Sequence, residues 1–420
     1  MPFMIQIKNK LLLPFILLFA LSTNINSQTN NLTGSPYSLF GLGVEGNSNI
    51  GKSSGMGYTG ISLDASEEIN FLNPASFATI KEKKFIFDIG FYTQIESLNN
   101  GENNELRHVT NFSNFAIGFN ANGKYGLGLS LLPSSNVGYT LVGIESIIEG
   151  SNNESYSTNI TGSGSLNDLR IDYGQPLLKN LNVGLRFSYL FGKIEETESV
   201  QTTTSLLAIE KDNYYSGVRF GFGAQYTFLE KNTIGLTIES PTSLSASRDT
   251  TTSKITESAL TTIEETTNEN IANFKLPLKL GLGISKKYKY FNFALDFKKS
   301  FWNSTNQSDE TGDYVDQNII NFGTEFIKDP TSYKYWERIN YRAGFNYDSG
   351  YLKVDDKNIS SSSFSLGLGF PLDFNGSKLN LSYGYKKTGN IDGILIQENI
   401  HTININLSLT DLWFIKRKYN

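Results

Sequence analysis

The segment "LNVGLRFSYLF", residues 181–191, alternates between apolar and small or polar side chains along its whole length. One face of an extended chain would carry only apolar and aromatic residues, namely Val183, Leu185, Phe187, Tyr189 and Phe191. The other face would carry Gly184, Arg186 and Ser188. A period of two with one strongly apolar face is typical of a half-buried β-strand. We therefore predict a strand here that separates an apolar from a polar environment.

The same alternation recurs along the chain, in "VRFGFGAQYTF", "INYRAGFNY", "FSLGLGF", "LNLSYGY" and "INLSL". It gives fourteen strand candidates, centred near residues 89, 115, 130, 170, 187, 221, 237, 280, 295, 322, 343, 366, 382 and 404. A soluble sandwich would also alternate, so the connections between the strands decide the fold.

Short and long connections between the predicted strands alternate along the chain. The short ones include residues 121–124, 229–232 and 286–290, and the long ones are the Thr-, Ser- and Asn-rich segments 194–212, 246–270 and 301–316. An even strand number with short turns at one end and long loops at the other is typical of an outer-membrane barrel. The predicted fold is therefore an all-β, transmembrane antiparallel barrel of about fourteen strands.

Composition narrows the function classes. The 420 residues contain 38 Gly, 29 Phe and 22 Tyr but no Cys, which favours one large β structure without disulfides. His108 and His401 are the only histidines, so a zinc or iron site of ordinary ligands is not expected. A net charge of -5 gives no basic surface for nucleic acid. We expect no cofactor, no metal and no nucleic-acid partner.

The N-terminal residues resemble an export signal. Lys8 and Lys10 precede the apolar run "LLLPFILLFAL", and polar residues up to Ser27 follow it. This run is too short for a comfortable membrane-spanning helix and fits a signal peptide, residues 1–27. We expect export to the outer membrane of a Gram-negative cell, followed by an N-terminal hatch segment (28–82), the barrel (83–412) and a basic periplasmic tail (413–420).

Charged residues fall on the non-apolar faces of the predicted strands, which would face the barrel lumen. They include Asp88, Arg170, Asp172, Arg186, Arg219 and Arg342. The favoured interpretation is a structural network of paired charges. A path for a substrate or an ion is the alternative, and the sequence leaves both open.

Glycines share the same lumenal faces, for example Gly223 and Gly344. Since a glycine in a strand often marks a close approach of another backbone or a ligand, these positions leave room inside the barrel. The segment that precedes the first strand mixes Gly, Ser, apolar and acidic residues. We predict that residues 28–82 fold as a plug in the lumen.

The segment "GYTGISLDASEEINFLNPASF", residues 57–77, leads directly into the barrel and resembles the FadL family of outer-membrane transporters for hydrophobic compounds. "SPYSLFGLG" and "LLPSSNVGY" resemble a divergent, Bacteroidetes-type branch of that family. The resemblance implies a hatch that closes the periplasmic side with an Asn-Pro-Ala turn, here Asn73, Pro74 and Ala75. A simple turn before a strand is the alternative interpretation of these three residues.

Pro133 lies inside the third predicted strand, where it removes a ladder donor. The resemblance implies that ligand leaves sideways through a gap at a kink in this strand, here at Leu132, Pro133 and Ser134, with the hatch turn lying against it. The apolar run that follows suggests an extracellular hydrophobic ligand site. Its residues would be Tyr139, Leu141, Val142 and Ile144.

Two functional classes remain. In the first, the barrel passively transports a hydrophobic, fatty-acid-like molecule through a hatch and a lateral opening. In the second, it is a non-transporting subunit of a larger outer-membrane complex, because FadL-like barrels also resemble an accessory component of type IX protein secretion. The partners expected are outer-membrane lipid and either a hydrophobic small molecule or that complex.

An enzyme is not expected. "GLGVEG", residues 41–46, satisfies a nucleotide-binding spacing, but no apolar strand precedes it and no helix pattern follows. Neither His108 nor His401 has the sequence context of a hydrolase nucleophile.

Overall fold

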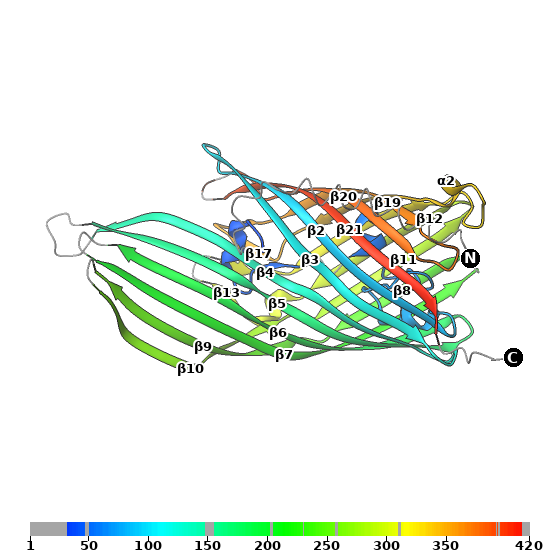
Figure 1. Cartoon of the computed structure of the whole chain (residues 1–420), viewed down its shortest axis with the longest axis horizontal. Coiled ribbons are helices and arrows are strands. Elements are labelled where there is room, and N and C mark those ends of the chain that lie inside the picture. The colour runs from blue at the N-terminus through cyan, green and yellow to red at the C-terminus, as the bar shows by residue number, and fades with distance from the viewer. Residues whose placement is uncertain are drawn as a thin grey trace, which may run out of the picture. The chain divides into compact units, whose positions relative to one another are not determined.

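The computed structural model describes residues 32–46, 50–147, 155–201, 205–229, 231–256, 259–309, 312–391, 393 and 395–413. The predicted signal peptide, the first residues of the hatch segment and the basic tail beyond Trp413 lie outside these residues. The described part is dominated by one closed antiparallel sheet (Figure 1).

The wall of the barrel consists of long antiparallel strands. In chain order they are β2 (Lys84–Asn99), β3 (Asn104–Asn120), β4 (Gly126–Ile147), β5 (Ser155–Leu178), β6 (Leu181–Gln201), β7 (Leu206–Phe228), β8 (Asn232–Glu239), β9 (Thr242–Ile255), β10 (Leu260–Leu276), β11 (Lys279–Tyr288), β12 (Phe291–Ser300), β15 (Gln317–Phe326), β16 (Asn340–Asp348), β19 (Ser361–Pro371), β20 (Lys378–Thr388) and β21 (Gln397–Leu412). The last strand, β21, pairs with β2 and closes the sheet.

Two crossings of the wall are interrupted. The break between β8 and β9 contains Pro241, and the break between β10 and β11 contains Pro277. Proline has no N–H to donate to a sheet ladder, which explains why the strand is interrupted at both places. Since β7 pairs with both β8 and β9, each broken pair is one wall strand. Counted in this way, the described residues form fourteen wall strands, and every predicted strand centre lies inside one of them.

The outer faces of the strands are apolar and the inner faces polar. Leu185, Phe220 and Leu282 are exposed on the outside, whereas Arg186, Ser188 and Asp296 are buried inside. Since a transmembrane barrel presents apolar residues to lipid, the predicted fold class is confirmed. The described residues contain no helix of the length and hydropathy that a membrane crossing needs.

Two of the predicted long loops are mostly strand, which corrects the sequence-based interpretation. Residues 194–212 belong largely to β6 and β7, and residues 246–270 largely to β9 and β10. These strands project beyond the rest of the barrel at one end, as Figure 1 shows for the green ribbons. A strand that extends beyond the membrane needs no apolar face. The Thr- and Glu-rich sequences of these two segments therefore show no alternation of apolar and polar residues.

The remaining elements lie in the connections between wall strands. Residues 301–316 form η4 (Trp302–Thr305), β13 (Ser308–Asp309) and β14 (Gly312–Tyr314), and β14 pairs with β17 (Leu352–Val354), which pairs with β18 (Lys357–Asn358). A short helix, α2 (Tyr335–Arg338), lies between β15 and β16.

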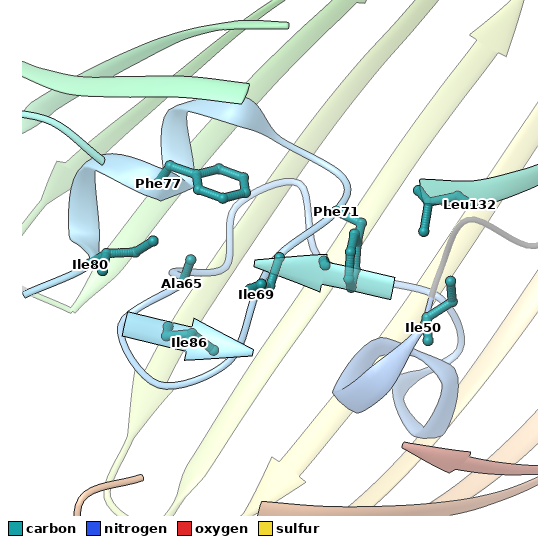
Figure 2. Close-up of a cluster of buried hydrophobic side chains, with 9 residues drawn as sticks. Ile50, Ala65, Ile69, Phe71, Phe77, Ile80, Ile86 and Leu132 are labelled. Carbon is teal, nitrogen blue, oxygen red and sulfur yellow. The ribbon is translucent and has the colours of Figure 1, made fainter. Parts of the chain in front are cut away.

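The N-terminal segment fills the lumen as predicted. It contains η1 (Pro36–Leu39), β1 (Val44–Glu45), η2 (Gly51–Met56) and η3 (Pro74–Thr79). Figure 2 shows how its apolar side chains gather around Ile69 and Phe71 and meet Ile86 on β2 and Leu132 on β4. We call residues 32–82 the plug.

Candidate functional site

The Asn73-Pro74-Ala75 turn begins η3 and is fully buried. The Asn73 side-chain oxygen accepts a hydrogen bond from the Ala75 backbone N–H at 3.0 Å, which caps the helical turn. The side-chain amide donates to the carbonyl of Ile61 at 2.8 Å and to those of Ala224 and Leu236 at 3.2 and 3.3 Å. One side chain thus holds the turn, the plug and two wall strands together.

Glycines of the wall make room for this turn. A Cβ atom on Gly184 would lie 2.3 Å from the Ala75 nitrogen, and one on Gly223 would lie 2.1 Å from the Asn73 side-chain oxygen. The turn therefore packs against β6 and β7. The expected contact with Pro133 is not among the contacts of the turn in the described residues, whereas Gly46 of the plug does approach Pro133.

A buried carboxylate of the plug, Glu68, is also fixed to the wall. It lies 3.3 Å from the Arg342 guanidinium and 3.1 Å from the Lys378 ammonium, and it accepts from the Asn380 amide at 2.7 Å. Burial alone would raise the pKa of Glu68, but the positive charges of Lys378 and Arg342 outweigh it and lower the pKa to about 2.

The six charged residues predicted to face the lumen are all buried. Arg186 lies 2.7 Å from Asp172 and 3.5 Å from Glu239, and Arg219 lies 3.4 Å from Glu239. Arg170 pairs with Asp168 at 2.6 Å. Asp88 accepts from the amide groups of Asn406 and Asn114. These ion pairs and hydrogen bonds are of the kind that a structural network contains.

The wall has a gap between β3 and β4. The two strands pair only from Phe115 with Leu131 to Phe119 with Leu127, although β3 extends back to Asn104 and β4 on to Ile147. The register of β4 against β5 shifts between Pro133 and Ser135. This shift falls in the segment Leu132–Ser134, where proline lacks the N–H of a ladder bond, and a lateral opening there stays a prediction.

The plug closes this gap from the lumen. Strand β1 pairs with the free edge of β4, with Val44 opposite Asn136 and Glu45 opposite Ser135. On the other side of the gap, the Arg107 guanidinium of β3 donates to the carbonyl of Gly34 at 3.2 Å.

A tyrosine of β2 also links the two sides of the gap. The Tyr92 hydroxyl accepts a hydrogen bond from the Asn111 amide of β3 at 3.1 Å and another from the Asn136 amide of β4 at 3.3 Å. Where β3 and β4 no longer pair with each other, one side chain therefore bridges them.

A cavity of about 300 Å³ lies in the lumen beside this closure. Its lining includes Tyr58, Ile61 and Leu72 of the plug and an aromatic group, Trp302, Tyr314 and Tyr351. It also includes the closing segment Val44–Gly46 and the stretch of β4 that it covers, Pro133–Ser135. Displacing β1 would therefore connect the cavity with the gap.

The four residues predicted to form an extracellular ligand site are not brought together. Tyr139 is buried in an apolar cluster with Leu42 and Leu141 packs against that cluster, whereas Val142 is 72 % exposed and Ile144 is exposed. A register shift between Leu141 and Ile144 separates the two pairs. The sequence reasoning missed the aromatic group around Trp302, for which the only signal was large aromatic residues inside otherwise polar connections.

The fold and the site together define a plugged transmembrane β-barrel with a gap in its wall. The sequence matches the model of the BamG family over residues 6–420, and the chain belongs to that family. None of the curated proteins compared with the chain is a match.

Solved structures share the fold. The Pseudomonas putida toluene transporter TodX is 14 % identical, with a TM-score of 0.58 over 89 % of this chain and 100 % of TodX. A Pseudomonas aeruginosa FadL homologue is 11 % identical, with a TM-score of 0.58 over 89 % and 99 %. The CymD monoaromatic hydrocarbon channel is 16 % identical, with a TM-score of 0.56 over 88 % and 99 %. The FadL-like fold predicted from the plug motif is thereby confirmed.

Proposed function

We propose that this chain is a passive conduit in a Gram-negative outer membrane for a small hydrophobic or fatty-acid-like molecule. The molecule enters the lumen, occupies the cavity and leaves sideways between β3 and β4, while the rest of the plug stays docked. No catalytic step is part of this proposal. The observation that carries it is the contact of the cavity with the two-residue closure of the gap.

The closure by β1 is much weaker than the docking of the remaining plug. A pair of two residues contributes a few backbone hydrogen bonds, each with a net value of about 0.5–1.5 kcal/mol. Removing the plug would break the buried Glu68 network and the bonds of Asn73 at the same time. Release through the gap is therefore the less costly route.

The solved structures with the same fold support the proposal by analogy. Two of them are described as a toluene transporter and a monoaromatic hydrocarbon channel. Because a shared fold does not establish a shared function, the analogy needs a direct test on this chain.

Uptake of a radiolabelled hydrophobic probe by intact cells provides that test. A Gram-negative host with a lipopolysaccharide leaflet should take up toluene or a fatty acid faster when it expresses this chain than when it expresses none. Uptake at the rate of the empty host, with the folded barrel present in the outer membrane, would refute the conduit.

A second function, as a subunit of a larger outer-membrane complex, is favoured by one observation. β10 pairs with β9 along one edge, and the registers of the described residues give its other edge no strand partner. Leu260 and Ile263 on this strand are 70 % and 58 % exposed. A long edge strand with exposed apolar residues can add a strand of another protein.

Affinity purification of the tagged chain in mild detergent, followed by mass spectrometry, separates the two functions. A stoichiometric protein partner that is lost from Ile263→Lys would favour the subunit. Val142→Lys on β4 serves as the control, because Val142 is also an exposed aliphatic residue, at 72 %, but does not lie on β10.

A further inference from the structure

One sector of the barrel ends in two exposed connections that neighbour each other. They are the turn between β11 and β12, residues 286–290, and the connection between β15 and β16, residues 327–339, which contains α2. β12 pairs with β15, and the Ile327 N–H donates to the Tyr290 carbonyl at 3.0 Å. Figure 1 shows α2 at the end of the barrel opposite the projecting strands. Because an outer-membrane barrel turns its short connections to the periplasm, this end faces the periplasm. We call residues 286–290 and 327–339 the rim.

The rim carries a group of exposed aromatic side chains, namely Tyr288, Tyr290, Tyr333, Tyr335 and Trp336. The Tyr290 ring meets Phe326 of β15 edge-on with centroids 6.2 Å apart, so the group continues onto the wall. Tyrosine and tryptophan gather at the headgroup level of membranes, because their rings are apolar and their tips are polar. The rim is therefore at the depth of the lipid headgroups.

The connection between β15 and β16 is folded, although its aromatic side chains are exposed. The Glu337 carboxylate accepts from Lys328 at 2.9 Å and from the Ser332 hydroxyl at 2.8 Å, and the Glu337 carbonyl accepts from the Asp329 N–H at 2.9 Å. These bonds fix the backbone that carries Trp336. A surface that is ordered before it binds loses less entropy on binding.

The rim is strongly basic in a chain whose formal net charge is -5. Its six basic residues are Lys286, Lys287, Lys289, Lys328, Lys334 and Arg338, and its two carboxylates are Asp329 and Glu337. Lys287 pairs with Asp64 of the plug and Lys328 pairs with Glu337. Lys286, Lys289 and Lys334 are exposed, and no ion pair joins them to a carboxylate in the part of the chain that the structure describes. Three ammonium groups are thus available to an anion.

Lys286 places these charges beside lipid. It lies on the outer face of β11 in line with Leu282 and Ile284, which are 53 % and 44 % exposed, and opposite Phe293 of β12. A lysine at the end of an apolar row lays its stem along that row and extends its ammonium to the polar boundary. The first polar group of a lipid that covers this row is its phosphate.

We infer that the rim binds the headgroup of an anionic phospholipid in the periplasmic leaflet, with phosphatidylglycerol as the simplest example. The free lysines pair with the negative headgroup, and the aromatic rings cover the glycerol and the start of the acyl chains. A zwitterionic phospholipid has no net charge and gains less from the same lysines. An acidic protein would not need a lysine among lipid-facing residues, so Lys286 favours lipid over protein. The inference is independent of the proposed conduit.

The test is tryptophan fluorescence of the complete mature barrel in liposomes of phosphatidylethanolamine and phosphatidylglycerol, with one of the two brominated near the head of its acyl chains. Bromine quenches a tryptophan that it contacts. Trp413→Phe leaves Trp336 as the exposed reporter in the rim. Trp336→Phe leaves Trp413, which is 48 % exposed and stacks on Phe85 at the start of β2, outside the rim. Trp302 is buried and gives the same background in both variants.

Phosphatidylglycerol should be enriched about two- to fivefold around Trp336, relative to its share of the liposome, and not around Trp413. The triple change Lys286→Gln, Lys289→Gln and Lys334→Gln, made in Trp413→Phe, should abolish the enrichment at Trp336.

The matched control removes the same charge from the same end of the barrel. It is the triple change Lys81→Gln, Lys124→Gln and Lys179→Gln, at three exposed positions before β2, between β3 and β4, and between β5 and β6. This control should keep the enrichment at Trp336. Because all six lysines are exposed and none forms an ion pair with the described residues, both triple variants should fold.

Three results would overturn the inference. The first is phosphatidylglycerol at its bulk share around Trp336. The second is an equal loss of enrichment in both triple variants, which would show a general attraction of the basic end rather than a site. The third is a Trp336 that neither lipid quenches, together with a periplasmic protein that copurifies with the barrel and is lost from the rim variant.

Discussion

Glu68 of the plug and Arg342 of β16 form a buried ion pair, with Oε1 and a terminal guanidinium nitrogen 3.3 Å apart. The same guanidinium lies 2.8 Å from Glu325, and Lys378 lies 3.1 Å from Glu68. Two wall cations thus share three carboxylates, Glu325 of the wall, the buried Glu68 of the plug and the half-exposed Glu67 of the plug. Removing the plug would leave the two cations with Glu325 as their remaining partner.

Glu68→Gln should loosen the plug. The change keeps the size of the side chain but leaves Arg342 and Lys378 undercompensated in a buried place, which costs about 3 kcal/mol. Hydrogen exchange of plug peptides, read by mass spectrometry, should rise strongly. Glu67→Gln is the control: this side chain also contacts Lys378, at 2.6 Å, but is 52 % exposed, so its loss should change exchange very little.

Acid should release the plug only at very low pH. The pKa of Glu68 is lowered in the folded state from 4.5 to about 2, so its contribution is fully present above pH 4.5 and disappears as the pH falls through about 2. Exchange of the plug peptides around Glu68, corrected for the intrinsic rate, should not rise between pH 7 and 5 and should rise in a step as the pH falls from 4.5 towards 2. In Glu68→Gln this acid-dependent step should be smaller, and an equal step in both proteins would contradict the assignment.

Gly344→Ala should prevent the plug from docking. The new Cβ would lie 2.0 Å from the Gly57 nitrogen and 2.2 Å from the Met56 carbonyl carbon, and neither backbone atom can move without shifting η2. Overpacking of this kind costs about 1–3 kcal/mol. Gly384→Ala, whose nearest atom is at 3.9 Å, should be tolerated. Labelling of a cysteine introduced at Ser62 in the plug, in this chain without native cysteine, reports docking in both variants.

Asn73→Asp should be as damaging as Asn73→Ala. Aspartate could still cap the Ala75 N–H, but its carboxylate would face the carbonyls of Ile61, Ala224 and Leu236, to which asparagine donates. A residue that only caps a turn accepts either side chain. Thermal unfolding of the two variants therefore distinguishes a plug anchor from a simple turn, because full tolerance of aspartate would show the simple turn.

The sequence predicts the barrel well because every strand that crosses the membrane must alternate apolar residues facing lipid with polar residues facing the lumen. The strand candidate near residue 187 lies in β6 and the one near residue 237 lies in β8, and each has an apolar face opposite a polar one. Residues 194–212 lack that pattern, although they lie largely in β6 and β7. The Thr-rich composition of this segment still favours a strand, but composition alone does not distinguish a strand from a loop.

The gap and the cavity depend on pairings that local sequence does not encode. Pro133 indicates a break in β4, but nothing in the residues around it shows that Val44 and Glu45 fill the break. Trp302 and Tyr314 lie in one connection, residues 301–316, and Tyr351 lies in the connection between β16 and β19, so the three rings meet only in the fold.

The most direct test of the account is a reversible lock across the closure. Glu45 and Ser135 are opposed on β1 and β4, so a disulfide between Glu45→Cys and Ser135→Cys holds β1 in place. Glu45→Cys alone controls for the lost contact with Lys279, and the Thr227→Cys/Thr233→Cys pair places a disulfide within the wall, between β7 and β8. We expect oxidation of the Glu45/Ser135 pair to stop uptake of the hydrophobic probe and a reductant to restore it. Equal uptake by the oxidised and reduced forms would contradict release between β3 and β4.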